Sequence, residues 1–178
     1  CLMDLPNLGD APPGRFPKSL GYSGVGRVAD VGSNVRSVEP GDRVLTYWGS
    51  THSNYNFLIE DNLLRIEDDS LPAEHAVFAI IAGFSLNGLR KTRLEIGESA
   101  AVVGLGILGL FAVGLCRIAG GSPVIATDLA AARRKKALEL GAHLAFDPAA
   151  DDYTEQVKDA GRGGADAVIE VTGQSIAL

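Results

Sequence analysis

The sequence contains few cysteines and no long run of basic residues. Of its 178 residues only Cys1 and Cys116 are cysteines, and no CxxC spacing occurs. This usage does not suit a disulfide scaffold and favours a reducing, cytoplasmic location. The net charge is −6, and this acidic balance argues against nucleic acid and membrane surfaces as partners.

A secretory signal peptide, an internal repeat and a low-complexity segment are also missing, and the chain begins at Cys1 rather than at methionine. We therefore expect that the true N-terminus lies further upstream. The composition, 46% hydrophobic and 21% charged, is typical of globular proteins. The length allows one large domain or two small ones.

What the sequence does contain is a glycine-rich turn between a strand pattern and a helix pattern. Its glycines are Gly104, Gly106 and Gly109. An apolar run at residues 100–103 precedes the turn, and a helix-length apolar segment, residues 107–119, follows it. A second apolar run, residues 123–127, ends at Asp128, 19 residues after the last glycine. This order is typical of a dinucleotide-binding βαβ unit.

Each part of such a unit has a physical task. Gly104 lets the chain reverse after the strand, and Gly106 lets a pyrophosphate approach the backbone. Gly109 lets the helix lie close to the sheet. The N-terminus of the helix, at Ile107 and Leu108, then presents free N–H groups and a partial positive charge to the phosphate.

Asp128 indicates which dinucleotide binds. At the end of the second strand its carboxylate can accept hydrogen bonds from both hydroxyls of an adenosine ribose. The basic run from Arg133 to Lys136 could reach a 2′-phosphate, but on an amphipathic helix it is typical of a solvated face. Because a carboxylate repels a 2′-phosphate, the sequence predicts NAD rather than NADP.

A membrane-spanning helix is the alternative interpretation of this segment. Residues 100–119 are 20 mostly apolar residues, long enough to cross a bilayer. The glycines near the start, Arg117 near the end and the strand pattern that follows argue against a span.

The remaining patterns divide the chain into a β-rich part, residues 1–71, and an α/β part, residues 72–178. In the first we expect a loop over residues 1–20 and strands within residues 21–32, 37–48 and 55–66. In the second we expect further helices over residues 73–91, 129–140 and 153–160, and strands over residues 143–146 and 167–171.

The α/β part carries four strand patterns, whereas a complete doubly wound dinucleotide fold uses six. In the usual strand order, 3-2-1-4-5-6, the first and fourth strands flank the ligand crevice. Thr172 and Gly173, which follow the fourth strand, are therefore predicted to border the cofactor.

Together these motifs resemble the medium-chain alcohol dehydrogenase-like family, which joins a GroES-like β domain to a Rossmann domain. The resemblance is carried by Cys1-Leu2-Met3-Asp4 (the family's C-x-T-D), Gly21-Tyr22-Ser23 (its G-H-E), Gly24 to Val31, Pro40 to Val44, Gly104 to Gly109, Asp128, Leu140 to Ala142 and Ile169 to Gly173. It implies an α/β fold in which a partial GroES-like β domain (residues 1–71) precedes a linker helix and a partial doubly wound Rossmann domain (residues 72–178). Family members are considerably longer, so it also implies that both ends are cut or that this is a reduced relative.

The zinc site of the family is poorly preserved. Zinc-dependent members use the C-x-T-D cysteine, the G-H-E histidine and a third ligand at the start of the linker helix. Cys1 fits the first place, but Tyr22 replaces the histidine and the third place falls at about Ile81, neither a usual zinc ligand. Met3 stands where the family has a proton-relaying hydroxyl, and residues 42–58 lack the cysteines of a structural-zinc lobe. We expect zinc binding to be lost or heavily altered, with Cys1 as the only retained ligand.

Zinc-free members of the family still transfer hydride, so the resemblance implies an NAD(P)-dependent oxidoreductase acting on an alcohol, polyol or carbonyl compound. The candidate catalytic residues are Cys1, Tyr22, Ser23 and His52. Plain structural roles compete with this assignment, because Tyr22 could pack in the β core, His52 could be a surface residue and Cys1 could be an inert thiol.

Two further functions stay open. One is a zinc-independent reductase of quinones or enones, and the other is a dinucleotide-binding module or inactive fragment without turnover. In each case we expect a small-molecule ligand. The resemblance also implies a homo-oligomer, a dimer or a tetramer, for the full-length protein.

Overall fold

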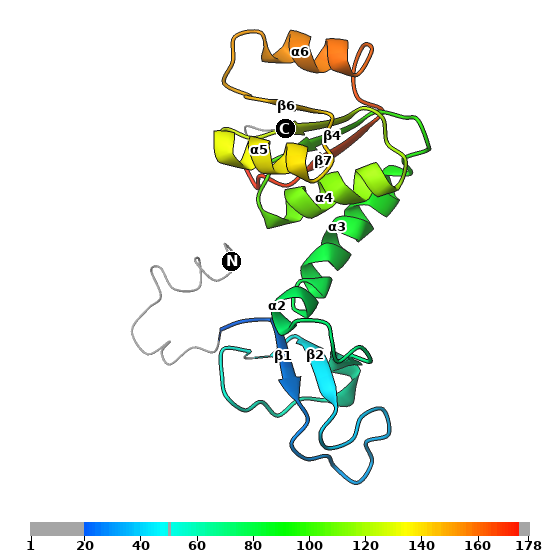
Figure 1. The fold of residues 1–178 in the computed structure, drawn as a ribbon, viewed down its shortest axis with the longest axis vertical. Coiled ribbons are helices and arrows are strands. Elements are labelled where there is room, and N and C mark those ends of the chain that lie inside the picture. Colours follow the sequence, from blue (N-terminus) through cyan, green and yellow to red (C-terminus); the bar gives the residue numbers. More distant parts are fainter. Residues whose placement is uncertain (1–19, 50, 175–178) are drawn as a thin grey trace. The chain divides into compact units, whose positions relative to one another are not determined.

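The computed structural model describes residues 20–49 and 51–174 of the chain (Figure 1). The chain divides into two compact units, Cys1–Ile80 and Ile81–Leu178. The predicted loop at residues 1–20 and the candidate residue Cys1 lie outside the described residues, apart from Leu20.

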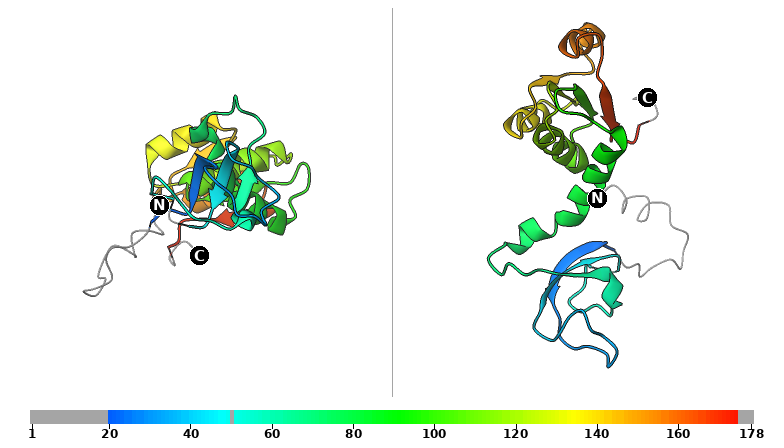
Figure 2. Two further views of the ribbon diagram at one scale, coloured as in Figure 1. Left: turned by 90° about the horizontal axis from the view of Figure 1, so that it is seen from below. Right: turned by 90° about the vertical axis from the view of Figure 1, so that its right-hand side faces the viewer.

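The first unit is built on a three-stranded antiparallel sheet of order β1-β2-β3. Its strands are β1 (Ser23–Arg27), β2 (Arg43–Tyr47) and β3 (Leu63–Arg65), seen side by side in the left view of Figure 2. The central strand supplies the buried residues Val44, Leu45 and Thr46. A strand was predicted within residues 55–66. Only its last part forms one, because residues 60–62 turn into a short 3-10 helix and residues 55–59 pair with no strand.

The predicted continuous helix over residues 73–91 is wrong, because two helices form. α2 covers Ala73–Ala76 and α3 covers Ala79–Thr92. At the break the Phe78 N–H donates to the His75 carbonyl at 3.1 Å, three residues back instead of the four of an α-helix. The Ser23 hydroxyl donates to the Val77 carbonyl at 2.9 Å, so β1 holds this tightened turn by a side chain.

The second unit alternates strands and helices, as its sequence predicts. Its elements are β4 (Ala100–Val103), α4 (Ile107–Ile118), β5 (Val124–Thr127), α5 (Ala131–Glu139), β6 (Leu144–Phe146), α6 (Tyr153–Ala160) and β7 (Ala167–Glu170). The strands are parallel in the order β6-β5-β4-β7. This order corresponds to strands 3-2-1-4 of the six-stranded doubly wound sheet, so the predicted fold class is confirmed.

The core of this unit lies between the central strands and α4. β4 and β5 read as continuous apolar runs because parallel strands with helices packed on them are buried. α4 contributes Ala112, Val113 and Cys116, each with 0% of its surface exposed. Burial raises the pKa of the Cys116 thiol to about 11, so this cysteine stays protonated at neutral pH. α4 and α5 lie along the same face of the sheet (Figures 1 and 2).

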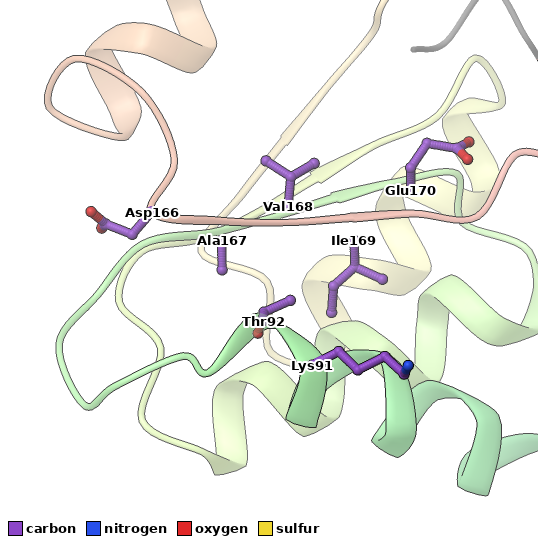
Figure 3. Close-up of a pocket in the computed structure, with 8 residues that line it drawn as sticks. Lys91, Thr92, Asp166, Ala167, Val168, Ile169 and Glu170 are labelled. Carbon is purple, nitrogen blue, oxygen red and sulfur yellow. The ribbon is translucent and has the colours of Figure 1, made fainter.

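β7 lies at one edge of the sheet and, among the described strands, pairs only with β4. Ala167 and Ile169 point toward the end of α3, whereas Val168 points away from it and is half exposed (Figure 3). A hollow of about 470 Å³ lies here, lined by β7, Asp166 and the last turns of α3. None of the predicted cofactor-binding residues lines this hollow.

Among the helices of the described residues, none is both long and apolar enough to cross a bilayer. The apolar stretch at residues 100–119 is instead a strand, a glycine turn and a helix.

Candidate functional site

The first part of the candidate site is the turn after β4. Gly104 has a φ of +92° and donates its N–H to the Thr127 carbonyl at 2.8 Å. A Cβ on Gly104 would lie 2.8 Å from Thr172 Cγ2 and 3.0 Å from the Thr172 backbone nitrogen. Only glycine therefore lets the end of β4 touch the end of β7 at this point.

The other two glycines of the turn differ from each other. A Cβ on Gly109 would lie 1.8 Å from the Gly104 carbonyl oxygen, so no side chain fits where α4 crosses the turn. A Cβ on Gly106 would meet no heavy atom within 4 Å, and its φ of −67° suits any residue. Packing therefore requires glycine at Gly109, whereas Gly106 faces open space.

This open space lies at the N-terminus of α4. Gly106 is the N-cap residue, and no side chain of the described residues caps the helix there. The N–H groups of Ile107 and Leu108 have no partner within their own helix, as at every helix start. The arrangement can bind an anion through backbone donors and the helix dipole.

Asp128 stands directly after β5 and is bonded on both carboxylate oxygens. Oδ2 accepts the Leu105 N–H and Oδ1 accepts the Ala130 N–H, each at 2.8 Å. The Arg133 guanidinium lies 3.5 Å from Oδ2. Burial raises the pKa of the Asp128 carboxyl, but the two amides and Arg133 outweigh it and hold this pKa below its ordinary value. The carboxylate is therefore charged at neutral pH and is tied to the glycine turn through Leu105.

The basic run on α5 is not a uniform solvated face. Arg133 keeps 57% of its side-chain surface exposed, but Arg134 keeps only 20%. Arg134 donates to the carbonyls of Asp128 and Leu129 and pairs with Asp147 at 2.9 Å. The interpretation of the run as a solvated face is wrong for this arginine, because the carbonyls after β5 and the carboxylate after β6 give it acceptors.

Thr172 and Gly173 follow β7, opposite the glycine turn. The Glu170 carboxylate accepts both the hydroxyl and the backbone N–H of Thr172, and these two bonds hold the Glu170 pKa below its ordinary value. Gly173 then turns the chain with a φ of +68°. The structure thus brings the glycine turn, Asp128 and Thr172 together at the carboxyl ends of β4, β5 and β7.

Three of the candidate catalytic residues, Tyr22, Ser23 and His52, lie around Gly21, whose φ is +86°. Tyr22 and Ser23 follow it directly, and a Cβ on Gly21 would lie 2.7 Å from the His52 ring. His52 is exposed, and its backbone N–H donates to the Leu20 carbonyl. The Ser23 hydroxyl is engaged by the Val77 carbonyl, so it is less available to a substrate than its sequence position suggests.

Sequence reasoning missed Trp48. Its N–H donates to the Tyr22 carbonyl at 2.9 Å, its side chain is 62% exposed, and its φ is +62°. A bulky residue in the left-handed region is strained, and such strain gathers at functional sites. Nearby, the buried hydroxyls of Thr46 and Thr51 have no hydrogen-bond partner among the described residues. No pattern in the sequence signals a backbone angle or an unpaired hydroxyl.

A zinc ion does not fit the residues that the structure describes. Within residues 20–49 and 51–174 no three His, Cys, Asp or Glu side chains lie close enough to hold a metal. The resemblance to the family puts Tyr22 and a residue at about Ile81 in two of the three ligand places, and neither residue type is a usual zinc ligand. Cys1, in the remaining place, lies outside the described residues. We therefore derive no chemical step through zinc.

The two units and the site define the class of protein, a GroES-like β unit followed by a nucleotide-binding type α/β unit. Comparison with the models of known families agrees with this class. The model described as "Alcohol dehydrogenase GroES-like domain" matches residues 1–70, and the model described as "Zinc-binding dehydrogenase" matches residues 108–178. The chain belongs to the medium-chain alcohol dehydrogenase-like family.

Individual relatives support this placement. The chain is 33% identical over 179 residues to D-guloside 3-dehydrogenase of Escherichia coli strain K12, a match that covers 99% of this chain and 51% of the relative. An alcohol dehydrogenase zinc-binding domain protein from Burkholderia ambifaria has a similar structure, with a TM-score of 0.87 and 25% identity over 100% of this chain and 62% of that one.

A zinc-binding dehydrogenase from Sinorhizobium meliloti 1021, solved bound to NADP, gives a TM-score of 0.78 at 27% identity, over 88% of this chain and 55% of that one. The chain spans about half the length of the curated relatives it matches.

Proposed function

We propose that the full protein is an NAD-dependent oxidoreductase that moves hydride between nicotinamide and an alcohol, polyol or carbonyl compound without a standard catalytic zinc. The observation that carries the proposal is the cradle at the carboxyl ends of β4, β5 and β7. Open space at Gly106, free amides at the start of α4 and a charged Asp128 meet there. Family membership and the dehydrogenase names of the relatives agree with it.

In this proposal the residues of the second unit bind and orient the dinucleotide. The amides of Ile107 and Leu108 bind the pyrophosphate, and Gly106 leaves room for it to approach. Asp128 accepts the ribose hydroxyls on the lone pairs that Leu105 and Ala130 leave free. Thr172 and Gly173 close the crevice at β7. The nicotinamide, when bound, supplies or accepts the hydride.

In the first unit, hydrogen-bond donors take over the work that a metal does in zinc-dependent relatives. The Tyr22 phenol and the His52 imidazole polarise the substrate carbonyl, and Trp48 supplies an exposed apolar surface beside Tyr22. Cys1 and the Ser23 hydroxyl are weaker candidates, the first outside the described residues and the second bonded to Val77.

We infer NAD rather than NADP because the Asp128 carboxylate is charged and, in its proposed ribose-binding role, would repel a 2′-phosphate. One similar protein was solved bound to NADP, and in this chain the exposed Arg133 guanidinium lies 3.5 Å from Asp128 Oδ2. A cytoplasmic location, a homo-oligomer and a small-molecule substrate remain part of the proposal.

Fluorescence titration with NADH and, separately, NADPH tests the proposal. We expect saturable binding that favours NADH, followed by turnover in a screen of alcohols, polyols, quinones and enones. Turnover of quinones or enones alone would replace the proposal by the reductase alternative. Absence of binding to either nucleotide would contradict the dinucleotide site.

A binding module without turnover is the second candidate function. The observation in its favour is the substitution of family zinc ligands by Tyr22 and Ile81. Saturable NADH binding with no turnover of any substrate class by the full-length protein would support it.

A further inference from the structure

We propose that Arg134 is a positioning residue of the nucleotide site, which sets the direction of the Asp128 carboxylate without touching the nucleotide. The inference rests on the proposed dinucleotide function. Within the basic run from Arg133 to Lys136, Arg134 is the residue whose side chain is largely buried.

Arg134 ties together the segments that follow two neighbouring strands. Its Nη1 donates to the Asp128 carbonyl at 2.7 Å and to the Leu129 carbonyl at 2.8 Å, both directly after β5. The same nitrogen lies 2.9 Å from Asp147 Oδ2, directly after β6. One guanidinium thus fixes two consecutive peptide units and anchors them to the next strand.

These two peptide units decide where the Asp128 carboxylate points. The peptide that contains the Leu129 carbonyl also contains the Ala130 N–H, and that N–H donates to Asp128 Oδ1 at 2.8 Å. A rotation of this peptide would break both bonds together. Because Oδ2 is held by the Leu105 N–H, the carboxylate keeps its direction only while both amides keep theirs.

The neighbouring arginine cannot play this part. Arg133 lies 3.5 Å from Asp128 Oδ2, is largely exposed, and contacts the carboxylate rather than the backbone that carries it. Arginine also suits position 134 better than lysine, because a guanidinium keeps its charge in a largely buried place, whereas burial readily lowers the pKa of a lysine amine.

A positioning role predicts a selective defect. If Arg134 acts through the Asp128 carboxylate, its loss weakens only the part of binding that depends on the ribose hydroxyls. An NADH analogue that lacks the 2′-hydroxyl on the adenosine ribose has already lost one of the two hydroxyl bonds to Asp128. A general loss of structure would instead weaken both ligands by the same factor.

The experiment compares Arg134→Gln with the original protein by fluorescence titration, using NADH and the 2′-deoxy analogue as probes. We expect the dissociation constant for NADH to rise about tenfold, as for the loss of a well-placed hydrogen bond to a charged group. We expect the dissociation constant for the 2′-deoxy analogue to rise by a smaller factor, because only its 3′-hydroxyl can bond Asp128. Lys135→Gln, one residue along the same helix, is the matched control and should leave both constants unchanged. Arg134→Lys should restore part of the NADH affinity because it keeps the ion pair with Asp147.

A second measurement needs no nucleotide. Hydrogen exchange of the Leu105 and Ala130 amides should be faster in Arg134→Gln than in the original protein, while amides in α4 keep their rates. Equal weakening of both nucleotides, or unchanged exchange at these two amides, would overturn the positioning role. Faster exchange in a protein that binds no nucleotide would uphold the mechanical link and reject the proposed dinucleotide function.

Discussion

Asp128 illustrates how one side chain can hold the site together and also contact the ligand. Its carboxylate accepts amides from the glycine turn and from the start of α5, through Leu105 and Ala130. The Asp128 side chain keeps only 9% of its surface exposed, so in the proposed function the group that would meet the ribose is also the group that shapes the turn. A substitution at this position therefore changes both stability and binding.

We expect Asp128→Ala to weaken NADH binding about tenfold, and NADPH binding less, because the second nucleotide gains from removal of a repelling charge. The variant also leaves the buried Leu105 N–H without its acceptor, which costs ~1–3 kcal/mol of stability. Titration with both nucleotides and urea unfolding measure the two effects. Equal losses for the two nucleotides would remove the ribose role from Asp128.

Trp48 allows strain and function to be separated. Its positive φ costs about 1–3 kcal/mol for a residue other than glycine. We expect Trp48→Gly to raise the free energy of unfolding while lowering kcat/KM, because the glycine relieves the backbone but removes the exposed ring next to Tyr22. Urea unfolding of the variant should show the higher free energy of unfolding, and steady-state kinetics on the same preparation should show the lower kcat/KM. A gain in stability with unchanged kinetics would make the strain incidental.

At the scale of elements, the turn between β4 and α4 distinguishes glycines required by packing from glycines required by a ligand. We expect Gly106→Ala to keep the stability of the protein but to lose NADH affinity by about tenfold, because the methyl group enters the open space. Gly109→Ala should instead destabilise the fold by at least the ~1–3 kcal/mol typical of overpacking.

Gly114→Ala is the control for both variants, since a Cβ there makes only an ordinary contact with the Leu140 carbonyl oxygen at 3.8 Å. It should stabilise α4 by about 0.5–1 kcal/mol and leave binding intact. Unfolding curves and NADH titrations of the three variants measure these effects. Normal NADH binding by Gly106→Ala would contradict the view that the ligand requires glycine at this position.

Hydrogen bonds between Ser99 and Asp166 join the starts of β4 and β7. The Asp166 carboxylate accepts the Ser99 hydroxyl at 2.6 Å and the Ser99 N–H at 2.8 Å, and these bonds hold its pKa below the ordinary value. A lowered pKa stabilises the fold above the ordinary value of about 4, and this contribution is lost as the pH falls through the lowered pKa.

We therefore expect Asp166→Asn to lower Tm by a few degrees at pH 7 and to show a smaller further fall than the original protein between pH 4 and pH 2. Calorimetry across this range measures both. The exposed Asp159 of α6 provides the control, Asp159→Asn. Parallel Tm profiles for Asp166→Asn and the original protein would show that the Asp166 bonds contribute nothing to acid stability.

These elements also show what the sequence can and cannot predict. The glycine spacing and the apolar runs predict β4, α4 and β5 closely, because parallel strands and the helix between them obey simple periodicity. The break after α2 was not predictable, because it depends on a bond from Ser23, more than 50 residues away. The engagement of Arg134 depends likewise on Asp147, which becomes its neighbour only through the pairing of β5 with β6.

At the scale of the whole molecule, the two units have changed unequally relative to the family pattern. The α/β unit has the glycine turn, the acid after β5 and the strand order on which the proposed nucleotide binding rests. The β unit keeps its sheet and the Pro40-Gly41-Asp42 turn but has Tyr22 where the family has a zinc ligand. This contrast is the basis of our proposal that the protein binds the nucleotide and uses no standard catalytic zinc.

Metal content tests this view of the whole molecule. Because Tyr22 and Ile81 leave Cys1 without family partners, we expect the purified full-length protein to carry well under one zinc per chain in elemental analysis. We also expect a chelator to leave turnover and Tm unchanged, since a structural or catalytic zinc would stabilise the fold by its binding energy. Cys1→Ser is the diagnostic variant. A stoichiometric zinc in the original protein that disappears in Cys1→Ser would show that other residues complete a metal site around Cys1, and hydride transfer would then have to be derived through the metal.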